Sequence, residues 1–331
     1  MSGPGDVNPN ATTLKISTGR ALVFPGQGSQ AVGMGKELAE AYPVAAEVFE
    51  TVDAALGEKL STLMFEGPED ELTLTRNAQP ALMAVSIAVL RVLKSESGKS
   101  IAQLCDAVAG HSLGEYSALC AANALDLDVT ARLLRLRGDS MQQAVPVGEG
   151  AMAALIGVDL ETAQAIADQA SQGDVCDVAN DNADGQIVLS GASAAIDRVV
   201  EIAPGLGAKR ALRLTVSAPF HCKMMAPAAD AMADALSTVD LRAPNVPLFA
   251  NVTAKPTSDR DVIRRQLVEQ VTGRVRWRES VLEMSAQGLT SVTEIGSGKV
   301  LTGLARRIDK SLQAGAINGP ADVDAFLATL G

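Results

Sequence analysis

Short apolar segments that fit β-strands alternate along this chain with segments of helical periodicity, and this alternation limits the folds open to it. In chain order these segments are an apolar one at 21–24, helical ones at 33–52 and 79–94, an apolar one at 106–110 and a helical one at 114–124. Strands that alternate with helices pair in parallel, and the helices cover both faces of the sheet. The sequence therefore predicts an α/β fold with a mostly parallel sheet.

The order of segments changes in the middle of the chain. Strands are expected at 150–157, 175–180, 186–190 and 209–216, with helices at 160–171 and 192–203. This βαββαβ order is that of a ferredoxin-like unit. We therefore expect a small inserted subdomain at 148–216, within a large domain made of 20–147 and 217–331. Residues 1–19 have little to bury and are expected to form a flexible tail.

Composition excludes several classes of function. The 331 residues can bury a core without disulfides or metal, and the four cysteines form no C-x-x-C pair, so no metal site is expected. The net charge of −11 does not suit nucleic-acid binding. The apolar run at 78–93 is too short and interrupted to span a membrane, and the N-terminus lacks the apolar core of a signal peptide. A cytoplasmic protein is expected.

The sharpest local motif is Gly110-His111-Ser112-Leu113-Gly114, between a predicted strand and a predicted helix. G-x-S-x-G in this context is typical of a nucleophile elbow, whose tight turn exposes the serine hydroxyl at a helix N-terminus. Ser112 is then the candidate nucleophile, and the backbone N–H of Leu113 a candidate oxyanion donor. A glycine turn with a capping serine is the alternative.

A serine nucleophile needs a base, and the chain has two histidines. His111 adjoins Ser112, and neighbouring side chains on an extended segment point to opposite faces, so its geometry is poor. His221 follows the last strand of the predicted insert, where a loop can reach the elbow. His221 is therefore the candidate base, with a purely structural role as the alternative; the sequence selects no carboxylate behind it.

Arg137 falls in the middle of the apolar side of a predicted helix over 128–144, together with Met141. Burying an unpaired guanidinium is costly, so an anion is expected beside it. Two partners remain open at this point. One is a core Asp or Glu in an internal ion pair, and the other is the carboxylate of a substrate, which the planar guanidinium fork can bind in bidentate fashion.

The loop Pro25-Gly26-Gln27-Gly28 follows the first predicted strand. Gly26, Gly28 and Ala31 formally match a dinucleotide-binding fingerprint. The alternative, which we favour, is that Gln27 supplies a second backbone N–H to an oxyanion hole opposite Ser112, as loops near this strand do beside nucleophile elbows.

Four motifs together resemble one known family. They are VFPGQGSQ (23–30), GHSLGEYSAL (110–119), LLRLRG with MQQAV (133–138 and 141–145) and EIGSGKVLTGL (294–304). In this order and spacing they resemble the malonyl-CoA:acyl-carrier-protein transacylases, the acyltransferase family of fatty-acid and polyketide synthesis. The resemblance covers about 20–308 and implies an α/β-hydrolase-like large domain with a ferredoxin-like insert.

The resemblance also implies roles for individual residues. Ser112 matches the nucleophile that the family acylates, and His221 matches its histidine base. Arg137 matches the arginine that holds the malonyl carboxylate. The oxyanion-hole donors match the backbone N–H groups of Gln27 and Leu113.

One further match is less direct. Gln270 matches the glutamine whose backbone carbonyl orients the histidine, although Arg274 stands where the family usually has proline. An exposed helix-end residue is the alternative for Gln270. Phe220, just before the base, is expected to crowd an α-methyl branch or simply to pack. Met141, in the MQQAV motif, is expected to contact substrate.

The implied activity is ping-pong transfer of malonyl from malonyl-CoA to the phosphopantetheine thiol of acyl carrier protein in fatty-acid synthesis, by a monomer with no bound cofactor. The alternatives are a serine esterase or thioesterase, a non-catalytic binding module and a polyketide acyltransferase with another extender unit. An acidic carrier would need a basic patch on this acidic chain. The candidates are Lys209-Arg210, Arg306-Arg307 and Lys310.

Overall fold

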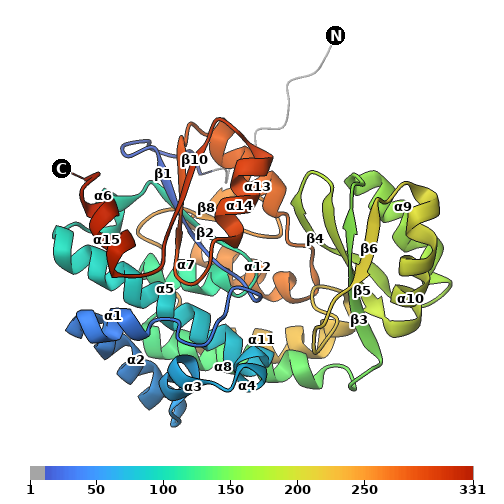
Figure 1. The fold of residues 1–331 in the computed structure, drawn as a ribbon, viewed down its shortest axis with the longest axis horizontal. Helices are drawn as coiled ribbons and strands as arrows, with labels where there is room; N and C mark the ends of the chain where they lie inside the picture. Colours follow the sequence, from blue (N-terminus) through green and yellow to red (C-terminus); the bar gives the residue numbers. More distant parts are fainter. Residues whose placement is uncertain (1–11, 331) are drawn as a thin grey trace.

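The computed structural model describes residues 12–330, and the larger of its two sheets has six strands (Figure 1). In spatial order these are β10 (Gln313–Ile317), β9 (Ser291–Ile295), β1 (Arg20–Phe24), β2 (Ala107–Gly110), β7 (Leu248–Phe249) and β8 (Pro256–Thr257). All neighbouring pairs from β10 to β7 are parallel, and β8 joins β7 antiparallel. The predicted α/β fold with a mostly parallel sheet is confirmed.

The central strand β1 is apolar because both of its faces are covered. Leu22 and Phe24 belong to one core and Ala21 and Val23 to another, as the two-residue period of a strand requires. Phe24 pairs with Gly110 at the end of β2. The carboxyl ends of the two strands therefore meet, and the segments that follow them lie side by side.

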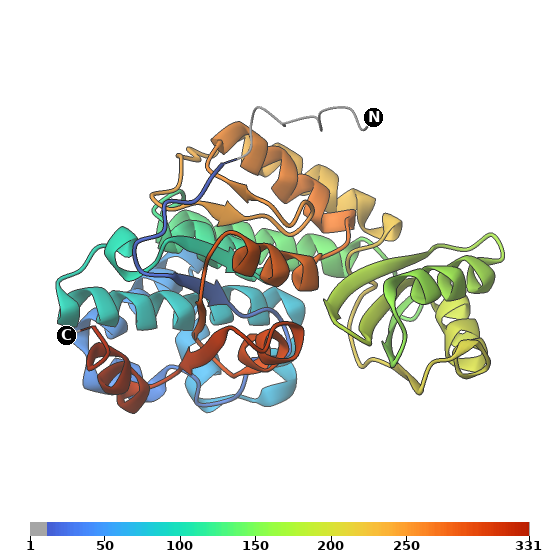
Figure 2. The ribbon, with the colours of Figure 1, turned by 90° about the horizontal axis from the view of Figure 1, so that it is seen from above.

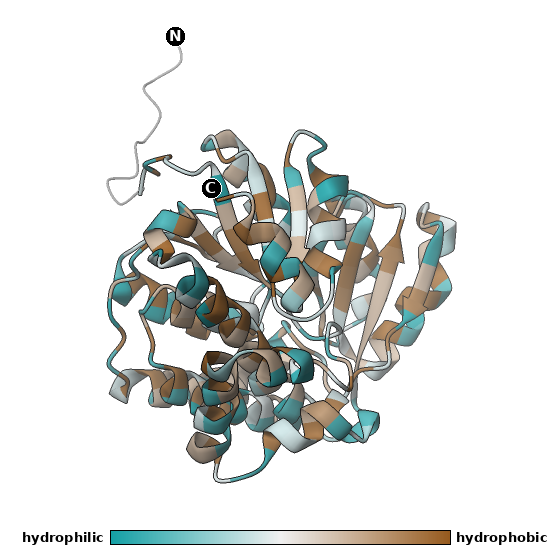
Figure 3. Ribbon diagram, turned by 60° about the vertical axis from the view of Figure 1, so that its left-hand side comes forward, coloured by the Kyte–Doolittle hydropathy of each residue, from teal (hydrophilic) through white to brown (hydrophobic). Residues whose placement is uncertain are grey.

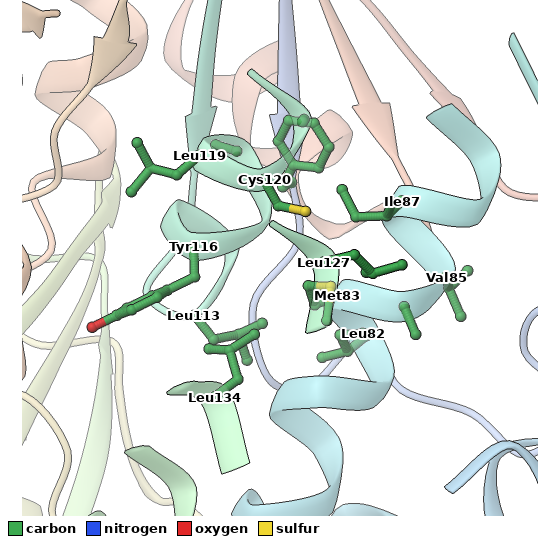
Figure 4. Packing of buried hydrophobic residues seen from close by; sticks show 14 of the residues in the cluster. Leu82, Met83, Val85, Ile87, Leu113, Tyr116, Leu119, Cys120, Leu127 and Leu134 are labelled. Carbon is green, nitrogen blue, oxygen red and sulfur yellow. The ribbon is translucent and has the colours of Figure 1, made fainter. Parts of the chain in front are cut away.

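Helices cover both faces of this sheet. One core contains residues of α1 (Lys36–Ala41), α2 (Pro43–Leu56), α3 (Leu60–Glu66), α4 (Glu69–Thr73), α5 (Thr75–Ser97), α6 (Ile101–Leu104), α7 (Gly114–Ala121), α8 (Leu127–Gln143), α11 (Ala226–Thr238), α12 (Arg260–Thr272) and α15 (Pro320–Leu327). The other contains residues of α13 (Trp277–Ala286) and α14 (Val300–Ile308). Figure 4 shows Tyr116 of α7 and Leu113, which precedes this helix, in one apolar cluster with Leu82 and Met83 of α5. The α7 helix is buried between the sheet and these helices.

The second sheet has four antiparallel strands in the order β4 (Cys176–Ala183), β5 (Gln186–Ala192), β3 (Gly150–Ile156) and β6 (Arg210–Arg213). The helices α9 (Leu160–Ser171) and α10 (Ser193–Ile202) pack on one face of it. On the other face Met152, Ala179 and Val188 form a small apolar cluster with Phe220. Figure 2 shows this layer beside the larger sheet, and Asn180 of β4 bridges to Val275 just before α13.

Several elements differ from the sequence predictions. The helix predicted over 33–52 is two helices, because Pro43 starts α2 where the chain turns at Tyr42. The last predicted strand of the insert, over 209–216, pairs only as β6, Arg210–Arg213. The strands β7, β8 and β10 were not predicted, and neither were the helices α3, α4, α6, α11, α13 and α15.

The structure also differs in part from the predicted flexible tail at 1–19. Residues 1–11 lie outside the described residues. The backbone N–H groups of Ser17, Thr18 and Gly19 donate to the carboxylate of Asp106 at 2.7–3.1 Å. Leu14 is buried. The prediction of a flexible tail is therefore wrong for 17–19, which are fixed to the residue that precedes β2.

Helix α5 is long and apolar enough to cross a membrane by length and composition, but 83% of its most apolar window is buried inside the protein. Figure 3 shows hydrophobic strands in the interior and hydrophilic stretches on outer helix surfaces. Among residues 12–330, no three His, Cys, Asp or Glu side chains gather as they would around a metal ion.

Candidate active site

Ser112 lies in a tight turn between β2 and α7 and has a positive φ of 53°. The turn leaves no room for side chains on the flanking glycines. A Cβ on Gly110 would lie 1.9 Å from the Gly114 carbonyl, and one on Gly114 would lie 2.2 Å from the carbonyl oxygen of Phe24. The two glycines therefore let the strand, the helix and β1 approach closely around the serine, as a nucleophile elbow requires.

Asn251, which follows β7, holds this turn from the other side. The backbone N–H of Ser112 donates to Asn251 Oδ1 at 2.8 Å, and Asn251 Nδ2 donates to the carbonyl of Gly110 at 2.7 Å. One amide side chain thus satisfies two backbone groups of a strained turn. Because β7 pairs with β2 over only two residue pairs, nothing in the sequence pattern pointed to Asn251.

His221 is 4% exposed and contacts the serine directly. Its Nε2 lies 2.8 Å from Ser112 Oγ, and its Nδ1 lies 2.8 Å from the backbone carbonyl oxygen of Gln270. A carbonyl only accepts, so Nδ1 carries the proton and Nε2 is free to accept the serine proton. Burial, followed by the charge of Arg137, lowers the pKa of His221 to about 3. The imidazole is therefore neutral at physiological pH.

Arg137 is 1% exposed and reaches the same serine from α8. Its Nη2 donates to Ser112 Oγ at 3.1 Å and to Gln270 Oε1 at 2.8 Å, and its Nη1 donates to Gln79 Oε1 at 2.8 Å. Its Nε has no partner. Throughout the described chain, no carboxylate lies within ion-pair distance of this guanidinium. The internal ion pair that the sequence left open is absent, and the buried cation has only neutral ligands.

A cavity of about 340 Å³ opens onto these groups. Its lining includes every predicted site residue except Gln270, namely Gln27, Ser112, Leu113, Arg137, Met141, Phe220 and His221. Gln270 is 0% exposed and lies behind the cavity, so the alternative of an exposed helix-end residue is wrong. Its side chain bridges Arg137 and the Ser112 backbone.

The loop after β1 closes the other side of the cavity. A Cβ on Gly26 would lie 2.8 Å from the carbonyl oxygen of His111, so this loop touches the elbow. Within 12–330, the backbone N–H groups of Gln27 and Leu113 donate to no other protein group. Both are therefore free to bind an oxygen atom in the cavity.

His111 has a different role from His221. Its Nε2 lies 2.8 Å from Asn182 Oδ1 of β4, and its ring lies 5.7 Å from that of Trp277. It makes no hydrogen bond to Ser112, in keeping with the expectation that it points away. It connects the elbow to the four-stranded sheet.

Residues 21–317 match the family described as "Acyl transferase domain". The chain therefore belongs to the acyl transferase family.

The names of individual relatives are more specific than the description of the family. The malonyl CoA-acyl carrier protein transacylase of Bacillus subtilis (strain 168) is 45% identical over 311 residues, which cover 94% of this chain and 96% of that protein. The crystal structure of an acyl-carrier-protein S-malonyltransferase from Bartonella henselae is 56% identical, with a TM-score of 0.93 over 95% of this chain and 100% of that one. A malonyl-transacylase in complex with its type II polyketide acyl-carrier protein is 42% identical, with a TM-score of 0.90 over 94% of this chain and 99% of that one.

Proposed function

We propose that this chain transfers a malonyl group from malonyl-CoA to the phosphopantetheine thiol of acyl carrier protein in fatty-acid biosynthesis, through a malonyl ester on Ser112. The observation that carries the proposal is the position of Ser112 Oγ, 2.8 Å from a neutral imidazole and 3.1 Å from a buried guanidinium with no carboxylate partner. The names of the Bacillus subtilis and Bartonella henselae relatives describe the same reaction.

In the first half-reaction, the Ser112 hydroxyl attacks the malonyl thioester while His221 Nε2 accepts its proton. The tetrahedral oxyanion is bound by the backbone N–H groups of Gln27 and Leu113, and loss of one such donor typically costs about 10²–10³ in rate. As the C–S bond breaks, His221 returns the proton to the CoA sulfur. In the second half, His221 takes the proton of the carrier thiol, the sulfur attacks the ester, and Ser112 recovers its proton.

A carbonyl oxygen, rather than a carboxylate, orients His221. Such a partner fixes the tautomer but stabilises the imidazolium less than a carboxylate would. Thioesters are reactive enough that this weaker base suffices. The arrangement thus fits thioester exchange better than amide hydrolysis.

Selectivity for malonyl comes from Arg137. The malonyl carboxylate would supply the counter-charge that the buried guanidinium lacks, whereas an acetyl group would leave it unpaired. Phe220 and Met141 line the same cavity, and the half-buried Phe220 ring is placed to crowd a branch at the α-carbon. Malonyl is therefore favoured over methylmalonyl.

The proposal extends to the architecture and setting of the enzyme. Residues 148–216 form a ferredoxin-like subdomain inserted into an α/β-hydrolase-like large domain of 20–147 and 217–331. The support is that every strand of the four-stranded sheet lies within 150–213 and every strand of the larger sheet lies outside it. The enzyme acts in the cytoplasm as a monomer, without nucleic acid, membrane or bound cofactor.

The carrier protein is proposed to dock where two candidate basic residues come together. Lys209 and Arg307, from opposite sides of the junction between the two sheets, line one cavity of about 680 Å³. The same lining holds Asp159, and Asp181 and Asp184 paired with Arg278. Arg210, Arg306 and Lys310 are also exposed, and each lies within three residues of Lys209 or Arg307 along the chain. Charge reversal at Lys209 should weaken malonyl transfer to an acidic carrier and leave acylation by malonyl-CoA unchanged.

The decisive experiment is intact mass spectrometry of the chain mixed with malonyl-CoA, followed by addition of acyl carrier protein bearing phosphopantetheine. We expect a malonyl adduct that moves to the carrier and is absent in Ser112→Ala. Ser117→Ala, at a buried serine of helix α7 five residues further along the chain, is the matched control and should form the adduct. Release of free malonate without transfer would instead indicate a thioesterase.

A further inference from the structure

Glu115 is a buried carboxyl group that the proposed reaction does not use. It lies in the first turn of α7, three residues after the nucleophile, and is 1% exposed. In the part of the chain that the structure describes, no Lys, Arg or His lies within ion-pair distance of it. Burial raises the pKa of Glu115 to about 8, against the opposing effect of a hydrogen bond from Gln270. A buried acid without an ion pair is costly, so its contacts call for an explanation.

Those contacts are with two residues that hold the nucleophile. Glu115 Oε2 accepts a hydrogen bond from Gln270 Nε2 at 2.5 Å, and Glu115 Oε1 accepts one from the backbone N–H of Asn251 at 3.4 Å. Gln270 Nε2 also donates to the Ser112 carbonyl at 2.9 Å. Glu115 therefore lies directly behind the groups that position Ser112, without touching the cavity.

The hydrogen bonds fix which way the Gln270 amide points. A primary amide has donors on nitrogen and acceptors on oxygen. With Nε2 held by Glu115 and by the Ser112 carbonyl, Oε1 must face Arg137, whose Nη2 donates to it at 2.8 Å. The reversed amide would place its N–H donors against the guanidinium and its oxygen against the Ser112 carbonyl. Glu115 thus selects the orientation in which Gln270 accepts from Arg137.

We propose that Glu115 is a positioning residue for acyl-group selection, which acts through the Gln270 amide to hold Arg137 Nη2 beside Ser112 Oγ. This inference rests on the proposed function. The His221 partner is the backbone carbonyl of Gln270, which helix α12 holds independently of the side chain. Loss of Glu115 should therefore disturb the arginine more than the histidine, and affect selectivity more than the chemical step.

The test compares the rates at which malonyl-CoA and acetyl-CoA acylate Ser112, followed by intact mass, together with thermal unfolding. Glu115→Met keeps the length of the side chain and removes both acceptors, and Glu115→Asp withdraws the carboxyl group from Gln270. In each we expect the preference for malonyl over acetyl to fall about tenfold or more, because small misplacements of a binding group have large effects on rate. Glu115→Gln retains an acceptor oxygen and should recover most of the preference.

The matched control is Glu294→Asp. Glu294 is also fully buried, and it accepts hydrogen bonds from Leu301 and Thr302 at the start of α14, away from the cavity. It should lower thermal stability without changing the acyl preference. The double variant Glu115→Met with Gln270→Met should show no greater loss of preference than Gln270→Met alone.

A folded Glu115→Asp with unchanged preference, or equal losses for both acyl groups, would overturn the inference. Since Asp retains a buried carboxyl group, this variant decides the question even if Glu115→Met does not fold. A wild-type chain that forms no malonyl adduct would instead contradict the proposed function. The two failures are therefore distinguishable in one set of measurements.

Discussion

His221 Nε2 lies 2.8 Å from Ser112 Oγ, although 109 residues separate the two in sequence and both have positive φ, of 58° and 53°. A non-glycine residue in the left-handed region costs roughly 1–2 kcal/mol. Asn251 holds the serine in this conformation, and the Gln270 carbonyl holds the imidazole. Nucleophile and base are thus aligned before any substrate binds.

The depressed pKa of His221 predicts a specific loss of stability in acid. In the folded chain burial lowers this pKa to about 3 from its ordinary 6.5, so the unfolded chain binds the extra proton between these values. The contribution of neutral His221 is fully present above about pH 6.5 and is lost as the pH falls towards 3. Between about pH 7.5 and about pH 5, urea unfolding should show a loss in the unfolding free energy of order 1–2 kcal/mol that His221→Gln does not share. If the unfolding free energies of the wild type and His221→Gln changed with pH in parallel, the lowered pKa of His221 would be contradicted.

Arg137→Ala should lower the rate of acylation by malonyl-CoA by about 10²–10³-fold and leave acylation by acetyl-CoA equal or faster. The reason is that the guanidinium is the only cation placed beside Ser112 Oγ in residues 12–330. The ratio of the two rates, followed by intact mass, is the measurement. Arg132→Ala, on the exposed face of the same helix and paired with Asp128, is the control and should keep the wild-type ratio.

Phe220→Ala should admit a branched acyl group. Removal of the half-buried ring enlarges the cavity beside His221, and one extra carbon in a pocket is typically worth about 10–200-fold in discrimination. We expect the methylmalonyl adduct to gain at least about tenfold relative to malonyl. Phe326→Ala removes another half-buried ring, which packs on Arg20 at the amino end of β1, away from the cavity, and should leave the ratio unchanged. An unchanged ratio in Phe220→Ala would mean that the ring only packs.

Asp106→Ala should destabilise the fold by about 2–4 kcal/mol, because the carboxylate accepts hydrogen bonds from three consecutive backbone N–H groups at 17–19. Burial opposes ionisation, but the hydrogen bonds from Ser17 and Thr18 outweigh it and lower the pKa of Asp106. The stabilisation is therefore present above the ordinary value of 3.8 and is lost as the pH falls through the lower folded pKa. Thermal unfolding at neutral pH, with exposed Asp168→Ala as control, measures the effect.

Long segments with a clear period were predictable from the sequence. The strand at 107–110 and helix α9 lie where periodicity placed them, and Arg137 is buried on its helix as the apolar side indicated. Leu136, the residue before Arg137 on the same helix, is 38% exposed, because successive side chains of a helix point about 100° apart.

Short and isolated elements were not predictable. β7 and β8 are two residues long, so they have no period to recognise, and their strand character comes from pairing with β2 and with each other. The partners of Arg137 are equally hidden. Gln79 and Gln270 are 58 and 133 residues away from it in sequence, and only the fold brings these amides together. Gln79 did interrupt an apolar run, which is the one local sign that a buried polar contact was needed there.

The close packing around Gly110 and Gly114 has a consequence for how enzymes of this architecture diversify. Main-chain contacts among Gly110, Gly114 and Phe24 fix the position of Ser112 Oγ. These contacts leave no room for a methyl group on either glycine. The acyl group, by contrast, meets side chains such as Phe220 and Met141, which belong to other segments. Substrate choice can therefore be altered by substitution at the cavity wall while the point of attack stays where it is.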